Sequence, residues 1–380
     1  MEKLSRETLA GQADEKFMDR ALRLAKRGLG RTSPNPPVGA VVVRDGEVVA
    51  EAYHHGAGKP HAEAEALEAA GERARGAAIY VTLEPCCHYG RTPPCAPALI
   101  HAGIKRVVAP FADPDPRVAG KGFDELRRAG VEVVVGIGQK EAESLIEAHR
   151  KYVTERMPFV TLKMAASLDG KIATRAGRSR WISSEKARRW SRRLRRLNDA
   201  IMVGLGTVIA DDPELLAGKA GGRQPLRVVV DSLARLPLDA RLLSNSRQPP
   251  LIAVTGKADP QKVEQLRELG AEVVAVPSDD GRVDLRELLR KLAEREVTSV
   301  VVEGGGTLAA SFLEKGLVDR VAIVIAPIIL GGQKAPTPVE GEGVEDVAQA
   351  LRVLDVEVRR LGPDILVQGR LAQGAHRGAG

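Results

Sequence analysis

Short apolar runs alternate with amphipathic stretches through the N-terminal part of the chain. Apolar residues at helical spacing, followed by a glycine, predict a helix over 14–28. The apolar runs 38–44 and 47–53 flank Asp45-Gly46, a pair typical of the two-residue turn between antiparallel strands. The alternation continues with predicted helices over 61–74, 96–103 and 123–130 and predicted strands over 77–83, 105–111 and 131–137. We therefore expect an α/β domain with crossover helices on its sheet.

The alternation restarts after Pro158, where we place a domain boundary. Predicted strands cover 159–165, 200–204, 226–231, 251–255, 271–276, 298–303 and 319–327, with further strands within 356–369. Predicted helices cover 185–197, 259–270, 284–294 and 307–316, the first capped by Ser183 or Ser184. We interpret the apolar run 321–330 as a buried strand. The pattern predicts domains over 1–157 and 158–372, a larger sheet in the second, and a disordered tail over 373–380.

Composition fits this two-domain interpretation. The chain has 380 residues, more than one hydrophobic core usually serves, and 43% hydrophobic with 28% charged residues is typical of a soluble globular protein. Its longest apolar run is too short to cross a bilayer, so we expect no membrane partner. The charged N-terminus lacks the apolar segment of a secretory signal, so we expect a cytoplasmic protein.

The net charge of +7 favours anionic partners. Aromatic residues make up only 3% of the chain, which leaves few platforms for stacking single-stranded bases. We therefore expect no nucleic-acid partner, while charge alone does not separate nucleic acid from phosphorylated small molecules. For any single arginine of the most basic run, 186–196, the pattern favours a solvated helix face over a functional role.

All three cysteines lie within TLEPCCHYGRTPPC, residues 82–95. An odd number in one cluster does not fit a disulfide framework and favours thiolates that bind a metal. His61 opens a predicted helix upstream, while Cys86 and Cys95 follow a predicted strand. One histidine and two thiolates supply three tetrahedral zinc ligands and leave the fourth position for water, which is typical of a catalytic site.

Glu63 stands two residues after His61, where it can move a proton between that water and a departing amine. The pattern thus predicts hydrolytic deamination. A purely structural zinc site, with Cys87 as fourth ligand, is the alternative. Adjacent cysteines chelate one ion awkwardly, and Glu63 would then have no purpose.

Four stretches of the first domain, SPNPPVGAVVV, YHHGAGKPHAEAEAL, TLEPCCHYGRTPPC and DPDPRVAGKG, resemble the deaminase half of the RibD family of bifunctional riboflavin-biosynthesis proteins. The resemblance implies a cytidine-deaminase-like α/β/α domain that acts on a diamino-ribosylaminopyrimidinone phosphate. It favours Cys86, which follows a proline, over Cys87, where the family usually has serine. It also implies substrate contacts from Asn35, His54, His88 and Arg91.

Two glycine-rich stretches of the second half follow predicted strands. Gly304, Gly305 and Gly306 precede a helix at Thr307, and Gly204 and Gly206 precede Thr207. Free N–H groups at a helix start can bind a phosphate. Neither stretch has the G-x-G-x-x-G pattern of a dinucleotide fold, and a tight turn without a ligand fits either one equally well.

Six further stretches, LKMAASLDGKIAT, SRWISSEKAR, VGLGTVIADDPEL, LRVVVDS, VVEGGGTL and APIILGG, resemble the reductase half of the same family, whose fold is similar to dihydrofolate reductase. The implied reaction is hydride transfer from NADPH to the ribosyl side chain of the deaminated pyrimidine. The implied catalytic residue is Lys163. The implied NADPH contacts are Ala165, Trp181, Thr207, Asp211, Ser232, Gly305, Gly306, Thr307 and Leu308, and the implied substrate contacts are Ser179, Arg195, Leu215 and Glu303.

The chain departs from the family after Asp211-Asp212-Pro213. The family commonly has L-T-x-R there, with an arginine for the substrate phosphate, whereas this chain has Leu216 for threonine and no arginine at that spacing. Lys219 or Arg223, together with Arg195, are the candidate substitutes.

We expect a homo-oligomer, a dimer or tetramer. Two other interpretations stay open: a nucleic-acid base deaminase with an unrelated second domain, and a zinc-stabilised binding protein whose reductase-like domain is inactive.

Overall fold

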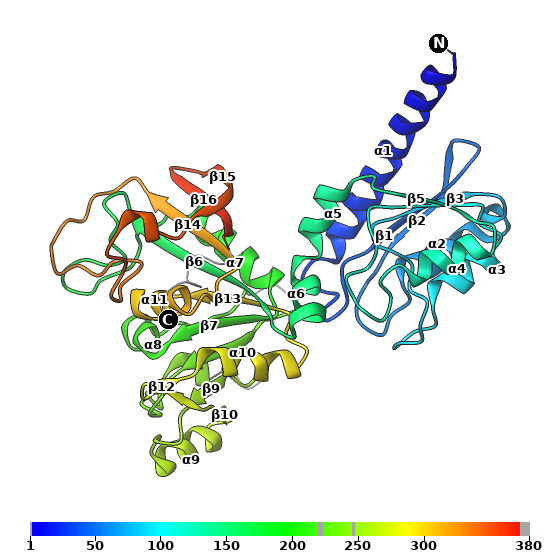
Figure 1. Cartoon of the computed structure of the whole chain (residues 1–380). Coiled ribbons are helices and arrows are strands. Elements are labelled where there is room, and N and C mark those ends of the chain that lie inside the picture. The colour runs from blue at the N-terminus through cyan, green and yellow to red at the C-terminus, as the bar shows by residue number, and fades with distance from the viewer. Residues whose placement is uncertain (1, 219–222, 245–247, 373–380) are drawn as a thin grey trace. The chain divides into compact units, whose positions relative to one another are not determined.

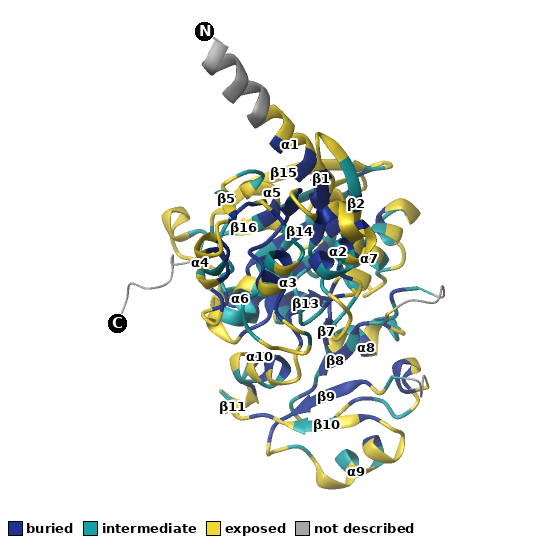
Figure 2. Ribbon diagram, turned by 90° about the vertical axis from the view of Figure 1, so that its right-hand side faces the viewer, coloured by how far each residue is buried: buried dark blue, intermediate teal, exposed yellow. Residues whose placement is uncertain are grey.

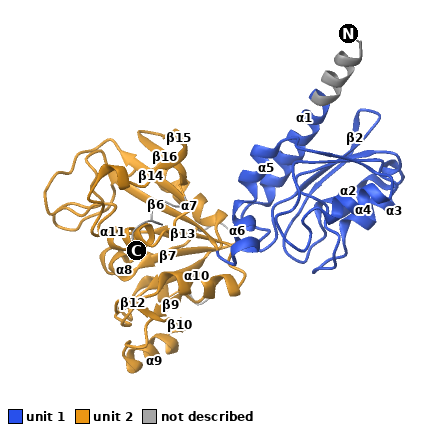
Figure 3. Cartoon of the chain, viewed as in Figure 1, with its two compact units in different colours: residues 1–157 blue, residues 158–380 orange. Residues whose placement is uncertain are grey.

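The structure is a computed structural model that describes residues 2–218, 223–244 and 248–372 (Figure 1). The chain folds into two compact units, Met1–Met157 and Pro158–Gly380 (Figure 3). The tail predicted to be disordered, 373–380, lies outside the described residues. Within the described ranges, no helix is both long and apolar enough to span a membrane.

The first unit is built on a five-stranded sheet with the order β2-β1-β3-β4-β5. Its strands are β1 (Gly39–Arg44), β2 (Glu47–Tyr53), β3 (Ala78–Val81), β4 (Arg106–Ala109) and β5 (Glu132–Val135). β1 runs antiparallel to β2 and β3, while β3, β4 and β5 are parallel. The predicted turn between β1 and β2 is confirmed, since Asp45 and Gly46 both have positive φ, at 54° and 80°.

Helices cover both faces of this sheet. The helices are α1 (Glu2–Gly28), α2 (Ala62–Ala70), α3 (Cys95–His101), α4 (Lys121–Arg128), α5 (Gln139–Leu145) and α6 (Glu147–Glu155), with a short 3-10 helix, η1 (Gly71–Ala74). One core joins α2, α3 and α4 to the sheet, and a second core joins α1 and α5 to it. The predicted three-layer α/β/α arrangement is therefore confirmed.

Two features of this unit differ from the sequence-based prediction. α1 begins at Glu2 instead of residue 14. The pattern also gave no helix after β5, where α5 and α6 follow each other with Ile146 between them. α6 has no buried residue, so no apolar periodicity marks it in the sequence.

The second unit contains a nine-stranded sheet with the order β10-β9-β8-β7-β13-β6-β14-β16-β15. Its strands are β6 (Phe159–Ser167), β7 (Ala200–Gly204), β8 (Leu226–Val230), β9 (Leu251–Val254), β10 (Glu272–Ala275), β13 (Ser299–Glu303), β14 (Arg320–Ala326), β15 (Val353–Leu361) and β16 (Asp364–Leu371). All neighbours from β10 to β14 are parallel, and β16 and β15 add an antiparallel edge. A separate small hairpin joins β11 (Ser278–Asp279) to β12 (Arg282–Val283).

The helices of this unit are α7 (Glu185–Leu197), α8 (Leu205–Asp211), α9 (Pro260–Glu268), α10 (Leu285–Glu294) and α11 (Gly306–Glu314), with 3-10 helices η2 (Arg241–Leu243) and η3 (Val347–Gln349). Ser184 caps α7 by accepting a hydrogen bond from Ala187 N, as the sequence suggested. β9 is fully buried and β13 is buried along its length, whereas the outer turns of the helices are exposed (Figure 2).

The prediction of a buried strand over 321–330 is wrong at its C-terminal end. β14 stops at Ala326, and Ile329 is 75% exposed. Pro327 has no N–H to continue the ladder, and Ile328 N instead donates to Ala326 O in a tight turn. The carboxylate of Asp169 then accepts hydrogen bonds from the backbone of Leu330 and Gly331. The loop is held by polar contacts, so its apolar side chains remain exposed.

Gly39 offers a direct test of the packing in the first unit. A Cβ at this position would lie 2.1 Å from the carbonyl oxygen of Ala21 in α1, a contact between backbones that no rotamer change relieves. We predict that Gly39→Ala lowers the free energy of unfolding by about 3 kcal/mol, measured by urea denaturation of the full chain. Gly56→Ala, whose Cβ would make only an ordinary 3.4 Å contact, serves as the control. Equal stability of both variants would contradict this packing.

Candidate functional site

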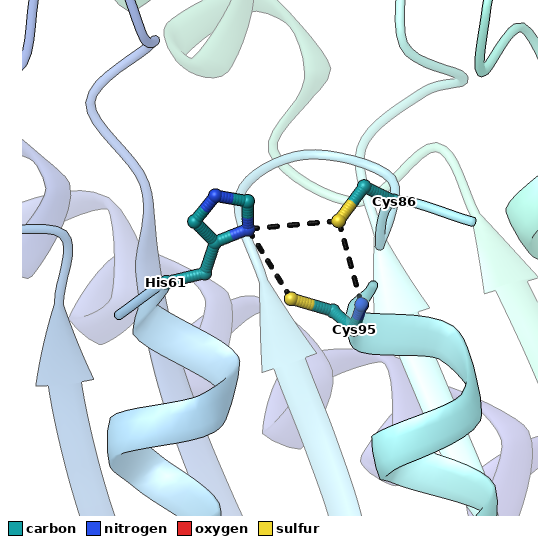
Figure 4. A group of neighbouring side chains, drawn as sticks. All are labelled: His61, Cys86 and Cys95. Atoms are coloured by element: carbon teal, nitrogen blue, oxygen red, sulfur yellow. Dashed lines mark hydrogen bonds between the residues drawn. The ribbon is translucent and has the colours of Figure 1, made fainter. Parts of the chain in front are cut away.

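The first unit brings three predicted metal ligands together (Figure 4). His61 immediately precedes α2, Cys86 lies in the loop after β3, and Cys95 is the first residue of α3. The Nδ1 atom of His61 lies 3.6 Å from Cys86 Sγ and 3.3 Å from Cys95 Sγ. All three donor atoms fall within 4.8 Å of one another. One imidazole nitrogen and two sulfurs form the donor set of a catalytic zinc site.

The surroundings of the two sulfurs favour the thiolate form at Cys86. Hydrogen bonds from Cys95 and from His61 lower the pKa of Cys86 to about 4, although burial acts in the opposite direction. The backbone N–H of Cys95 also donates to Cys86 Sγ over 3.4 Å. The bond to Cys86 and burial together raise the pKa of Cys95. A bound divalent cation would favour the thiolate at both positions.

Thr92 completes this arrangement, and the sequence gave no signal for it. Its Oγ1 lies 3.0 Å from Nε2 of His61, on the side of the ring that faces away from the sulfurs. When Nδ1 binds the metal, the proton of the neutral ring is on Nε2, which then donates to the threonine hydroxyl. Such a partner fixes both the tautomer and the orientation of a histidine ligand.

Glu63 lies in the first turn of α2 and is only 4% exposed. Burial raises the pKa of its carboxyl, which also forms a hydrogen bond with Cys95. A buried carboxyl directly beside the ligand cluster is placed to take up and release a proton.

The predicted pyrimidine contacts differ in burial and in hydrogen bonding. The His54 ring lies edge-on to His61 at 5.3 Å, donates from Nδ1 to Pro60 O, and accepts from Asn35 Nδ2 over 3.1 Å. Burial lowers the pKa of His54, which favours its neutral form. Nδ1 of His88 is buried and has no hydrogen-bond partner among the described residues. Arg91 is exposed.

Cys87 lies outside the ligand group. It is a half-buried free thiol whose pKa is raised by burial and by the nearby charge of Glu125. Within the described part of the chain, the metal-ligand group contains Cys86 and not Cys87.

A buried carboxylate holds the loop that carries Cys86. Glu84 accepts backbone hydrogen bonds from Asp113, Gly120 and Phe123, at 2.8, 2.9 and 3.1 Å. Gly122 lies so close that a Cβ there would stand 2.0 Å from the carbonyl oxygen of Pro85. Sequence reasoning missed this role, because the three backbone groups that Glu84 binds lie far along the chain.

The second unit has a cavity of about 820 Å³ at the carboxyl ends of the parallel strands β6, β7 and β13. Such an edge is the usual ligand site of an open α/β sheet. Its lining includes most of the predicted reductase residues: Lys163, Ala165, Ser179, Trp181, Arg195, Thr207, Asp211, Leu215, Glu303 and Gly305. The predicted residues Ser232, Gly306, Thr307 and Leu308 are not part of this lining.

Lys163 and Glu303 are register neighbours on β6 and β13, and their charges lie 3.8 Å apart. Arg195 of α7 donates to both carboxylate oxygens of Glu303, at 2.9 and 2.8 Å. Burial raises the pKa of Glu303, but the two cations outweigh it and hold the pKa at about 2. Burial lowers the pKa of Lys163 despite the attraction of Glu303. The amine is therefore less basic than a solvated lysine.

Other predicted residues of the cavity wall contact one another. Thr207 Oγ1 accepts a hydrogen bond from Gly305 N over 3.1 Å, and a Cβ on Gly304 would stand 2.3 Å from that oxygen. Ser179 donates to Asp211 over 2.5 Å. Trp181 is 68% exposed at the cavity, so its ring is available to a bound molecule.

Two of the candidate substitutes for the missing phosphate arginine already pair with carboxylates. Lys219 lies outside the described residues. Arg223 pairs with the buried Asp199 at 2.7 Å and is not part of the cavity lining. Arg195 is engaged by Glu303, so neither Arg223 nor Arg195 is an uncommitted cation in the cavity.

Comparison with family models agrees with both sites. Residues 11–110 match the cytidine and deoxycytidylate deaminase zinc-binding region. Residues 158–367 match the RibD C-terminal domain. Fold and site together define a protein that joins a zinc-dependent deaminase to a reductase, with zinc and NADPH as cofactors.

Full-length relatives narrow this class to one family. The RibD riboflavin biosynthesis protein of Actinobacillus pleuropneumoniae is 46% identical over 354 residues, which cover 93% of this chain and 94% of that protein. The structure of Acinetobacter baumannii RibD, form 1, superposes with a TM-score of 0.86 at 40% identity, over 96% of this chain and 100% of the other. A Thermotoga maritima structure gives 0.83 at 37% identity, over 96% and 100%. The chain belongs to the RibD family of bifunctional deaminase-reductases of riboflavin biosynthesis.

The Thr92 contact yields a prediction about metal affinity. Thr92→Val removes the acceptor of His61 Nε2 while keeping the side-chain shape, so we expect zinc to bind at least about tenfold more weakly in competition with a chelator. Thr92→Ser retains the hydroxyl and should bind zinc as the wild type does. Unchanged affinity in the valine variant would show that this hydroxyl does not position the ligand.

Proposed function

We propose that the first domain deaminates 2,5-diamino-6-(5-phosphoribosylamino)pyrimidin-4(3H)-one. The Thermotoga maritima relative is described as a diaminohydroxyphosphoribosylaminopyrimidine deaminase and 5-amino-6-(5-phosphoribosylamino)uracil reductase. His61, Cys86 and Cys95 hold zinc, which supplies the Lewis acid that makes water nucleophilic near neutral pH. Glu63 takes a proton from the attacking water and delivers it to the departing ammonia. Asn35, His54, His88 and Arg91 bind the pyrimidine and its phosphate.

The second domain reduces the ribosyl side chain of the deaminated product to ribityl. NADPH supplies the hydride. Lys163 polarises the open-chain carbonyl or imine. Because its pKa is lowered, its ammonium group gives up a proton to the substrate more readily than a solvated lysine does. Ser179, Arg195, Leu215 and Glu303 contact the substrate. The cofactor contacts are Ala165, Trp181, Thr207, Asp211, Ser232, Gly305, Gly306, Thr307 and Leu308. Four of them, Ser232, Gly306, Thr307 and Leu308, do not line the cavity, so the bound cofactor would extend past the cavity wall to contact them.

One observation carries this proposal. Each unit concentrates its own reactive groups: a three-ligand metal site beside the buried Glu63 in one, and a buried lysine beside a large cavity in the other. A nucleic-acid deaminase with an unrelated second domain would leave the second arrangement without a purpose. A binding protein with an inactive reductase-like domain would leave Lys163 and its cavity unused.

The remaining expectations are part of the same proposal. The partner is a small phosphorylated pyrimidine, and neither nucleic acid nor a membrane is bound. We place the protein in the cytoplasm. We also propose a homo-oligomer, a dimer or tetramer, because β15 is an edge strand with exposed apolar side chains at Val356 and Val358.

Two variants separate the two activities in the full-length protein. Glu63→Ala removes the proton carrier, so we expect ammonia release to fall by at least about a hundredfold. NADPH oxidation should persist when deaminated substrate is supplied. Glu65→Ala, a change of the same type on the same helix, serves as the control. Unchanged ammonia release in the Glu63 variant would contradict the role of Glu63 as the proton carrier in deamination.

Lys163→Ala tests the second half. Without the amine, the substrate carbonyl or imine loses its polarising donor, so NADPH oxidation should fall by at least about a hundredfold while ammonia release survives. Lys186→Ala, at an exposed position on α7, is the matched control. Retained NADPH oxidation in the Lys163 variant would remove this residue from the mechanism.

A further inference from the structure

One face of α7 forms a basic wall of the reductase cavity. Arg188, Arg192 and Arg195 stand at the spacing that places side chains on one side of a helix, and all three line the cavity. Arg189 and Arg193 are exposed and do not line it. The sequence-based interpretation of this basic run as a solvated face therefore fits only part of the helix.

Most of the other cations on the cavity wall already have a partner. Arg195 and Lys163 share Glu303. Arg241 pairs with Glu214. Each of these three cations therefore lies against a carboxylate, and the carboxylate that Lys163 and Arg195 share is buried.

Arg188 and Arg192 differ because the carboxylate that they share, Glu185, is exposed: its side chain is 52% exposed, against 9% for Glu303. Glu185 accepts from Arg188 at 2.8 Å through one oxygen and from Arg192 at 2.6 Å through the other. Arg188 also donates to Ser183 O and lies over the ring of Trp181 at 4.5 Å. Within the described part of the chain, Arg192 has Glu185 as its only partner, and one carboxylate shared by two guanidinium groups leaves a net positive charge at the cavity.

The described residues of the neighbouring loop add no cation to the cavity wall. Residues 213–218 contribute Pro213, Glu214, Leu215, Leu216 and Gly218 to the cavity wall, and none of them is basic. Gly218 has no side chain to offer, and its φ of 125° disfavours any other residue. Among the described residues, the basic side chains of the cavity wall are therefore Arg188, Arg192 and Arg195 of α7 together with Lys163, Arg180 and Arg241.

We propose that Arg192, assisted by Arg188, binds a phosphate monoester in this cavity, namely the 5′-phosphate of the pyrimidine substrate. This inference rests on the proposed reductase function. A guanidinium group matches phosphate oxygens in a bidentate fashion, and a phosphate dianion attracts it more strongly than one exposed carboxylate does. Glu185 therefore orients the two arginines in the free protein. When the phosphate binds, its oxygens replace the Glu185 carboxylate as the acceptors of the two guanidinium groups.

The test compares KM values in the full-length protein. Arg192→Gln should raise the KM for the phosphorylated, deaminated pyrimidine at least about tenfold, since one charge-assisted contact is lost. Its KM for the dephosphorylated counterpart and its kcat should hardly change. Glu185→Gln removes the competing carboxylate and should lower the KM for the phosphorylated substrate. Arg193→Gln makes the same charge change on the exposed side of the helix and should match the wild type.

Three results would overturn the assignment. An equal rise of KM in Arg193→Gln would mean that only net charge matters. An equal rise for phosphorylated and dephosphorylated substrates would rule out a phosphate contact. A changed preference for NADPH over NADH, with the substrate KM unchanged, would assign Arg192 to the cofactor's 2′-phosphate. Absence of NADPH oxidation in the wild type would instead contradict the proposed function.

Discussion

Parallel strand pairing is the constraint on which the reductase cavity depends. Residues far apart in the sequence meet because the carboxyl ends of parallel strands share one edge of a sheet. Lys163 and Glu303 become neighbours only through the register of β6 with β13. In the first unit, the parallel pairing of β3 with β4 sets the segment after β4 beside the loop that carries Cys86, where Glu84 fastens the two.

The two sites handle buried charge in opposite ways. In the first, Glu63 and the thiols of Cys86 and Cys95 surround the position of a cation. Loss of protons from these groups favours zinc binding, and zinc binding favours the loss of these protons. In the second, the buried Glu303 is held between Lys163 and Arg195, and Arg188 and Arg192 lie around the exposed Glu185 in the preceding turns of α7. The first arrangement suits activation of water, and the second suits binding of a phosphorylated substrate beside a lysine.

The sequence predicted most strands, because their apolar runs are continuous, and the zinc ligands, because histidine and cysteine carry little structural ambiguity. It missed α6, which buries no residue and so has no apolar stripe. It missed Thr92 and Glu84, since their roles arise from contacts with residues distant in the chain. The same limit applies to Arg192, whose neighbours Arg189 and Arg193 look alike in the sequence and differ only in which side of α7 they occupy.

The central claim is that deamination precedes reduction and that each reaction has its own site in one chain. The most direct measurement is NADPH oxidation by the full-length protein before and after zinc is removed with a chelator. The account predicts that the zinc-free protein no longer oxidises NADPH with the diaminopyrimidine substrate, still does so with the deaminated substrate, and recovers when zinc is restored. Undiminished NADPH oxidation with the diaminopyrimidine substrate in the zinc-free protein would contradict it.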